Sequence, residues 1–217
     1  MNSSLFEMGP PAPLSKDILG AGTAFLAGFA LEAEDELLDS LSCVIELSPF
    51  RNMVTPGGFR MSVAMTNCGR FGWVADRFGY RYHPLDPEMN RPWPTMPIVF
   101  RELAVAAAKA AGFPDFAPDA CLINKYEPGA RLSLHQDKNE HDLTQPVVSA
   151  SLGLPATFLF GGLNRTDRTR RVQVLHGDVV VWGGPARLSY HGIVPLRDGK
   201  HAKTGRVRYN LTFRKAG

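Results

Sequence analysis

Two kinds of hydrophobic spacing divide the chain. Over residues 31–48, leucine, valine and isoleucine recur at the three- and four-residue spacing of an amphipathic helix, and Pro49 stops it. A second helix is predicted from Pro97, which suits a first helical position, to about residue 111, before Gly112. From residue 119 onward the period falls to two, which predicts short strands in ACLINKY, RLSLHQD, PVVSASLGL, TFLFGG, RVQVLHG, DVVVWGG and VRYNLTFR.

Many short strands with no long helix among them favour an antiparallel sandwich or a double-stranded jelly roll. The predicted fold class is therefore mostly β with flanking helices, an α+β arrangement whose core occupies about 119–217. Residues 50–96 are rich in Gly, Pro, Met and aromatics without clean periodicity, and we expect short strands and long loops that could form a lid. Residues 1–17 are predicted to be a flexible tail, which leaves 18–217 as a single domain.

Composition indicates an ordinary globular protein of 217 residues, with 44% hydrophobic and 21% charged residues. No apolar run approaches the ~20 residues of a membrane span, and the N-terminus lacks a secretory pattern. The three cysteines are far apart and form no CxxC motif, so a disulfide framework is not expected. These features predict a protein of the reducing cytoplasm that does not enter a membrane.

The formal net charge is only +3, but the charges are unevenly placed. Residues 31–39 carry five acids and no base, whereas residues 165–171 carry four arginines and one acid. The tail from Arg197 onward has seven Lys or Arg and one Asp. This asymmetry is compatible with a phosphate-backbone partner, and a solvated charged face explains it equally well.

A candidate metal pair lies in the segment RLSLHQD. In an extended segment His135 and Asp137 project to the same face, because successive side chains alternate. A further histidine would complete the two-His, one-carboxylate triad of non-haem Fe(II) oxygenases. HxD alone is a weak signal, and a surface histidine beside a solvated aspartate would look the same. Spacing does not choose the third ligand among the remaining histidines, which are His83, His141, His176, His191 and His201.

The last predicted strand, VRYNLTFR, alternates strictly. Its apolar face carries Val207, Tyr209, Leu211 and Phe213, and its polar face carries Arg208, Asn210, Thr212 and Arg214. An exposed edge strand could show this pattern. Fixed guanidinium groups lining a pocket would instead bind carboxylates, and a dicarboxylate such as 2-oxoglutarate needs a cation for the carboxylate that lies far from the metal.

Taken together, HQD at 135–137, His191 and RYNLTFR at 208–214 resemble the AlkB family of nucleic-acid demethylases. The likeness runs from about residue 20 to the end of the chain. It includes the stretches MVTPGGFRMSVAMTNCG, RPWPTMP, PDFAPDACLINKYEPGARLSLHQDK, SLGLPATFLFGGL and HGDVVVWGG.

This resemblance implies a double-stranded β-helix (jelly-roll) core that holds Fe(II), with an N-terminal nucleotide-recognition lid at about 50–96. The implied metal ligands are His135, Asp137 and His191. The implied 2-oxoglutarate contacts are Asn124, Lys125, Tyr126, Arg208, Asn210 and Arg214, with Arg208 near the triad and Arg214 on the distal carboxylate. The implied substrate contacts are Trp73, Tyr80, Asn139 and Arg165.

The function implied is oxidative demethylation of N-alkylated bases, such as 1-methyladenine and 3-methylcytosine, in single- or double-stranded DNA. RNA is an open alternative. The reaction consumes O₂ and 2-oxoglutarate and releases succinate, CO₂ and formaldehyde, and the enzyme is expected to be a monomer. The target base must leave the stack to reach a buried metal. Trp73 and His135 could sandwich it, while Arg77, Arg131 and Lys138 are candidates to hold phosphates.

One residue departs from the family pattern. Asn139 stands where the bacterial family member has an acid that contacts the base edge of the lesion. Because a carboxylate attracts cationic lesions and an amide offers only hydrogen bonds, we expect weaker discrimination for cationic lesions. Two other functions stay open: the same oxygenase chemistry on a protein or small molecule, and a catalytically silent nucleic-acid-binding jelly roll.

Overall fold

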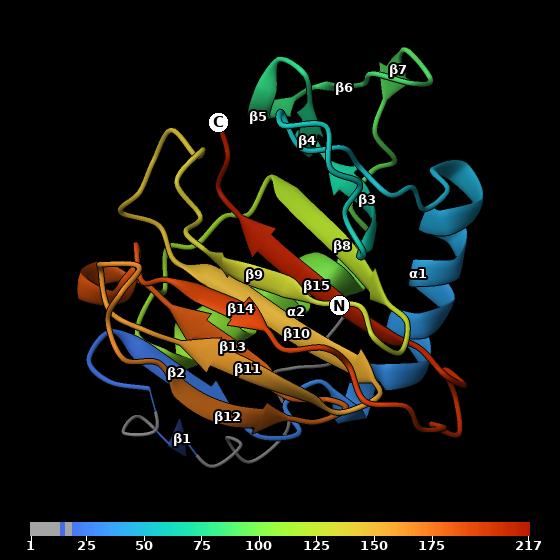
Figure 1. The fold of residues 1–217 in the computed structure, drawn as a ribbon. Helices are drawn as coiled ribbons and strands as arrows, with labels where there is room; N and C mark the ends of the chain where they lie inside the picture. The colour runs from blue at the N-terminus through green and yellow to red at the C-terminus, as the bar shows by residue number, and fades with distance from the viewer. Residues whose placement is uncertain (1–13, 16–18) are drawn as a thin grey trace.

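Two facing antiparallel sheets form the body of the protein in the computed structural model, which describes residues 14–15 and 19–217 (Figure 1). The larger sheet has seven strands in the order β1 (Leu14–Ser15), β2 (Thr23–Leu26), β13 (Val179–Trp182), β10 (Val147–Gly153), β15 (Arg208–Arg214), β8 (Ala120–Tyr126) and β3 (Ala64–Gly69). The smaller sheet has four, in the order β12 (Arg170–Val174), β11 (Ala156–Phe160), β14 (His191–Ile193) and β9 (Leu132–His135).

The antiparallel sandwich predicted from the period-two pattern is confirmed, because all the pairings within the two sheets are antiparallel. Apart from β1–β2 and β11–β12, neighbouring strands in the two sheets are not consecutive in the sequence. The two faces predicted for β15 are also confirmed. Leu211 and Phe213 lie in the core, while Arg208 and Arg214 face the space between the sheets.

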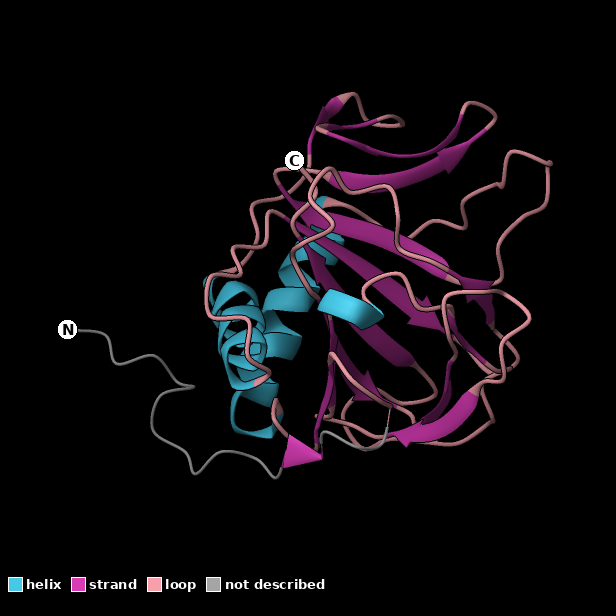
Figure 2. Ribbon diagram, turned by 90° about the vertical axis from the view of Figure 1, so that its left-hand side faces the viewer, coloured by secondary structure: helices cyan, strands magenta, loops and turns pink. Residues whose placement is uncertain are grey.

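Both predicted helices are confirmed. They cover the outer face of the larger sheet (Figure 2). A 3-10 turn at Leu31–Ala33 leads into α1 (Glu34–Leu47), and α2 spans Ile98–Ala110. Pro97 was predicted to be the first helical residue. It is instead the N-cap, and α2 begins one residue later, at Ile98. Gly112 follows the end with φ +93°, a left-handed conformation that glycine adopts at little cost.

Two hydrophobic clusters lie on opposite faces of the larger sheet. The outer cluster joins the helices to the sheet, with Phe100 and Phe213 in edge contact at 6.2 Å. The inner cluster lies between the sheets, where Phe158 and Trp182 pack with ring centroids 6.1 Å apart. Apolar side chains fill only part of the space between the two sheets. The polar face of β15 lines the remaining part.

Residues 50–96 are divided between the sheet and a separate layer. Within this range β3 is an integral strand of the larger sheet and pairs with β8 along its length. Two small hairpins follow above the end of the sheets (Figure 1): β4 (Gly72–Asp76) with β5 (Gly79–His83), and β6 (Leu85–Asp86) with β7 (Arg91–Pro92). Residues 50–63, before β3, are irregular chain with isolated bridges, and part of this stretch lines the cavity between the sheets. The part that could act as a lid is therefore smaller than the segment named from the sequence.

The predicted tail, residues 1–17, lies outside the described residues apart from Leu14–Ser15. Within the part of the chain that the structure describes, no helix is long and apolar enough to cross a membrane.

Candidate metal centre and substrate pocket

A cavity of about 770 Å³ opens between the two sheets, beneath the β4–β5 hairpin. All the site residues named from the sequence line this cavity except Lys125 and the phosphate candidate Arg77. They come from both sheets, from the segment after β9, from the β11–β12 loop and from the hairpin. The structure thus brings together side chains that lie up to 141 positions apart, from Trp73 to Arg214.

Strand pairing assembles the candidate metal ligands. His191 of β14 stands directly opposite His135 of β9, and the two imidazole rings lie 4.3 Å apart. Asp137 follows two residues after His135. Its carboxylate oxygens lie 3.9 Å from His135 Nε2 and 3.7 Å from His191 Nε2. One ligand atom from each residue fits within 4.8 Å of the others, a spacing suited to a single ion.

The hydrogen bonds of the two imidazoles leave their Nε2 atoms facing this common point. His135 Nδ1 bonds the Ser133 carbonyl at 2.9 Å, and His191 Nδ1 bonds the Ser189 carbonyl at 3.0 Å. A carbonyl only accepts, so each Nδ1 carries the proton and each Nε2 keeps its lone pair. Burial, with a contribution from nearby His135, lowers the pKa of His191 to about 3, so this imidazole is neutral at physiological pH. Neutral imidazole is the form that binds a metal.

The third candidate ligand is held by a buried arginine. Arg214 donates from Nε and Nη2 to Asp137 Oδ2 at 2.9 and 2.7 Å. Burial acts to raise the pKa of Asp137, but the charge of Arg214 and its hydrogen bonds to this carboxylate act against burial, and the pKa lies below its ordinary value. The carboxylate is therefore ionised. Two imidazoles and one carboxylate fit a divalent cation such as Fe(II).

A second polar wall lies on β15 and β8 and carries an uncompensated positive charge. Arg208 is 2% exposed, and its Nη2 donates to Ser151 Oγ at 3.0 Å. Its guanidinium lies over the Tyr126 ring at 5.0 Å, but Nε and Nη1 have no partner among the described residues. Asn124 Oδ1 is likewise buried without a partner there. A buried guanidinium with free donors fits an anionic ligand, because it is costly without one.

The positions of the two arginines relative to the candidate metal ligands differ from the expected ones. The resemblance placed Arg208 near the triad and Arg214 on the distal carboxylate. Arg214 is the residue that bonds Asp137, whereas Arg208 bonds Ser151 on the neighbouring strand β10. The reason is the register of β15 against β8, which sets Arg208 opposite Tyr126 and Arg214 opposite Ala120, at the other end of the strand.

The β4–β5 hairpin supplies an aromatic pair to the cavity. Trp73 and Tyr80 stack with ring centroids 5.5 Å apart and an angle of 13° between planes. Asn139 accepts from Trp73 Nε1 at 3.5 Å and donates to the Tyr80 carbonyl at 3.4 Å. Arg165 lines the same cavity from the β11–β12 loop. The hairpin thus presents flat π-surfaces to the cavity, and the Asn139 amide, two residues after Asp137, lies against them.

The sequence profile of the 2OG-Fe(II) oxygenase superfamily matches residues 22–214. The chain belongs to the 2OG-Fe(II) oxygenase superfamily. It is 60% identical over 199 residues to the alpha-ketoglutarate-dependent dioxygenase AlkB of Escherichia coli, covering 92% of each chain. It is therefore an Fe(II)- and 2-oxoglutarate-dependent dioxygenase. The residues that line its cavity fit both the iron and the 2-oxoglutarate.

Other relatives and one solved structure extend the comparison. A DNA N(6)-methyladenine demethylase, ALKBH1D of Arabidopsis thaliana, is 37% identical over 46% of this oxygenase and 25% of the relative. The tRNA demethylase abh1 of Schizosaccharomyces pombe is 34% identical over 45% and 33%. The solved structure of OsALKBH1 superposes with a TM-score of 0.80 at 29% identity, covering 94% of this chain and all of that one. The jelly-roll fold is thereby confirmed.

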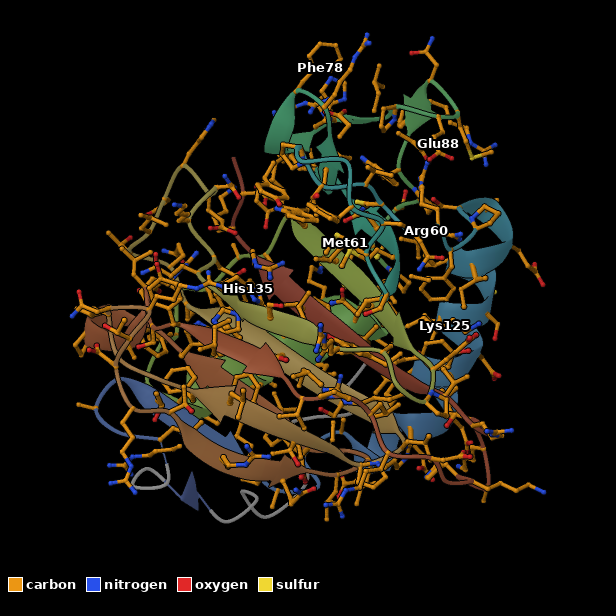
Figure 3. All side chains as sticks on the ribbon, in the orientation of Figure 1. Arg60, Met61, Phe78, Glu88, Lys125 and His135 are labelled. Atoms are coloured by element: carbon orange, nitrogen blue, oxygen red, sulfur yellow. The ribbon has the colours of Figure 1, made fainter. Side chains whose placement is uncertain are left out.

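Lys125 was expected in the 2-oxoglutarate site, but the structure places it elsewhere in the oxygenase. Its neighbours Asn124 and Tyr126 line the cavity, and alternation along β8 turns Lys125 to the opposite face. There its Nζ bonds Glu127 Oε1 at 2.8 Å. Figure 3 shows Lys125 well away from His135.

Glu140 was not among the site residues named from the sequence. The segment after His135 is not a strand, and the Glu140 side chain is 1% exposed against Arg187 and Arg214. Arg187 was not named from the sequence either, and it donates to the Asp137 carbonyl at 2.6 Å. Neither residue lies in a periodic pattern that could have revealed it.

Proposed function

We propose that this oxygenase removes methyl groups from ring nitrogens of nucleic-acid bases, with DNA as the substrate and RNA as the alternative. The observation that carries the proposal is the joining of three features in one cavity. These are the candidate metal triad, a buried arginine without an anion, and an aromatic pair on a hairpin outside the sheets. An oxygenase that acts on a protein or a small molecule would also need the metal triad and the buried arginine. It would not need an aromatic pair on a hairpin outside the sheets.

In this proposal His135, Asp137 and His191 hold the iron. Arg208 takes the distal carboxylate of 2-oxoglutarate, because its donors are free and buried, and Arg214 orients Asp137 at the metal end. Asn124, Tyr126 and Asn210 complete the wall around the co-substrate. When bound, iron with 2-oxoglutarate and O₂ supplies the oxidation that converts an N-methyl group to formaldehyde, leaving succinate and CO₂.

The protein's own residues bind and orient the base. A base inside a duplex cannot reach a metal between two sheets, so it must flip out or belong to a single strand. Trp73 and Tyr80 offer aromatic faces for stacking, and the Asn139 amide can both donate to and accept from a base edge. Arg165 and Lys138 line the cavity and could meet the phosphates.

The names of the relatives support this substrate class, since one is a DNA demethylase and another a tRNA demethylase. We further propose that the enzyme is a cytoplasmic monomer. Residues 18–217 would form one domain, with the β4–β5 hairpin as the part of the predicted lid that grips the nucleotide.

The direct test supplies the enzyme with Fe(II), 2-oxoglutarate and a trinucleotide that carries 3-methylcytosine. We expect formaldehyde and succinate in equal amounts, and neither above background with the unmethylated trinucleotide. Succinate without formaldehyde on every methylated oligonucleotide would exclude the repair function and favour another substrate class. Binding of the oligonucleotide without Fe(II) binding would favour a catalytically silent protein.

Trp73→Ala is expected to raise KM for the methylated trinucleotide while leaving KM for 2-oxoglutarate unchanged. Stacking of one base on an aromatic side chain contributes about 1–3 kcal/mol, which corresponds to roughly a 5- to 150-fold change. Steady-state kinetics with each substrate varied in turn measures both constants. The control is Phe78→Ala at the turn of the same hairpin, which is 74% exposed and lies outside the cavity. Equal effects of the two variants would argue against stacking by Trp73.

Asn139→Asp is expected to raise turnover of 3-methylcytosine, which is cationic, relative to that of a neutral lesion such as 3-methylthymine. A carboxylate about 4 Å from a cation contributes about 1–4 kcal/mol at the dielectric of a protein surface, so the ratio should rise at least about fivefold. Asn139→Ser changes the same contacts without adding charge and is the control. If the ratio of the two turnover rates is unchanged in Asn139→Asp, this position does not select lesions by their charge.

A further inference from the structure

A tyrosine of the nucleotide hairpin reaches into the charged cluster behind the metal triad. Tyr82 lies on β5, directly opposite Trp73 in the β4–β5 pairing. Its hydroxyl donates to Glu140 Oε1 at 2.7 Å. Burial raises the pKa of Tyr82 well above its ordinary value, so the hydroxyl keeps its proton and remains a donor.

Glu140 continues this contact toward the candidate metal ligand by two routes. Its carboxylate lies 3.4 Å from Arg214 Nε and 3.1 Å from Arg187 Nη2. Arg214 bonds the Asp137 carboxylate, and Arg187 bonds the Asp137 backbone carbonyl. Two carboxylates and two guanidinium groups therefore balance in one buried cluster. Glu140 Oε2 has no hydrogen-bond partner among the described residues, so the Tyr82 hydroxyl and the charges of the two guanidinium groups hold this carboxylate in place.

The same hairpin carries the aromatic pair of the substrate pocket. Two other hydrogen bonds join it to the metal side of the cavity, both at Asn139 and both long, at 3.4 and 3.5 Å. The Tyr82–Glu140 bond is shorter and has a charged acceptor, which makes it roughly twice as strong as a neutral bond. At its base the hairpin is anchored to β3 through Asn67, which bonds both the N–H and the carbonyl of Trp73.

We propose that Tyr82 is a positioning residue that couples closure of the β4–β5 hairpin to occupancy of the metal triad. A cation held by Asp137 fixes that carboxylate and, through it, Arg214 and Glu140. A fixed Glu140 in turn holds the Tyr82 hydroxyl and keeps the hairpin over the pocket. The enzyme would then present its base-stacking surface chiefly when the metal is in place. The inference rests on the proposed function only in assigning the hairpin to the nucleotide.

A simple packing role for Tyr82 predicts a different result. If the hydroxyl merely satisfies Glu140, its loss loosens the hairpin equally with and without metal. Coupling instead predicts that metal protects the hairpin in the native enzyme and that this metal-dependent part disappears with the hydroxyl. Coupling is also reciprocal, so the hairpin must strengthen metal binding by the same factor.

Amide hydrogen exchange over residues 72–83, with and without Mn(II) plus 2-oxoglutarate and without any nucleotide, tests the coupling. We expect the metal to slow exchange in the native enzyme by about tenfold, the strength of one hydrogen bond to a charged group. Tyr82→Phe should lose this difference and should bind Mn(II) about tenfold more weakly in a titration. Tyr209→Phe removes a hydroxyl on the opposite side of the larger sheet, where the ring stacks on Phe50, and should behave as the native enzyme.

Equal metal-dependent protection in Tyr82→Phe and the native enzyme would overturn the proposal, as would a native hairpin that ignores the metal. Glu140→Gln is a second variant that tests the coupling. Its amide oxygen can still accept the hydrogen bond from Tyr82, whereas its attraction to the Arg214 guanidinium is weaker because the charge is lost. It should reduce the metal-dependent protection as well. None of these measurements uses a methylated base, so failure of the demethylase function would appear in the formaldehyde assay alone.

Discussion

Replacing Arg208 with methionine is expected to stabilise the ligand-free protein and to remove most of its affinity for 2-oxoglutarate. The Arg208 guanidinium is buried with two free donors, and burial lowers its pKa, as expected for a charge without a nearby anion. Replacing a poorly compensated buried charge by an apolar side chain of similar length can raise the free energy of unfolding by about 1–4 kcal/mol. Urea denaturation without ligand measures this gain.

The same change removes the proposed partner of the distal carboxylate. Loss of one member of a buried charge pair costs about 2–5 kcal/mol of binding, so affinity for 2-oxoglutarate should fall at least about thirtyfold. Calorimetric titration with Mn(II) present measures it. Arg206→Met is the control, because Arg206 is exposed and pairs with Asp198 on the surface. A less stable Arg208→Met protein with native 2-oxoglutarate affinity would show that Arg208 serves the fold instead.

Much of the fold was predictable because its periodicity is local. A strand with one face against the core must alternate, and β8 and β15 therefore stand out in the sequence as ACLINKY and RYNLTFR. The two helices were predictable for the corresponding reason. The pairing order was not, because β15 lies between β10 and β8 through contacts that no local pattern records.

β3 could not be recognised as a strand of the larger sheet from its local sequence pattern. Its sequence, AMTNCG, carries polar residues at buried positions, and it does not alternate between apolar and polar residues. Asn67 and Thr66 are fully buried because they hydrogen bond to Trp73 and Ser48 respectively. A strand whose polar side chains are satisfied by distant partners has no hydrophobic period, so this segment was assigned to the lid.

The residues of the candidate site also fall into two groups, those that local spacing predicted and those that it did not. His135, Asp137 and the polar face of β15 were visible from residue spacing, whereas the choice of His191 depended on the family resemblance and agrees with its pairing opposite His135. The order of the two arginines and the inward turn of Glu140 depended on strand register and on the irregular chain after β9. Spacing indicates which residues share a face, but not what each one meets across the cavity.

Asp137→Asn is expected to abolish metal binding and, with it, turnover. The change removes the carboxylate of the triad, and an amide is a much poorer ligand for Fe(II) or Mn(II). Loss of a group that only supports a ligand weakens metal affinity about 10- to 100-fold, so loss of this ligand should exceed about 100-fold. A Mn(II) titration measures it. Asp142→Asn is the control in the same segment, because Asp142 is partly exposed, lies outside the cavity and bonds only Thr144 among the contacts described for it.

The variant should also change the acid stability of the metal-free protein, in a direction set by the pKa of Asp137. That pKa lies below its ordinary value of 3.8 in the folded protein, with the charge and hydrogen bonds of Arg214 acting against the effect of burial. The ionised carboxylate therefore stabilises the fold, fully above about pH 3.8 and less as the pH falls below it. Asp137→Asn lacks this contribution, so its free energy of unfolding should lie below that of the native protein at neutral pH. The gap should narrow in acid, as urea denaturation at a series of pH values would show. A gap that stays constant with pH, or that widens in acid, would mean that Asp137 is not held as an anion by Arg214.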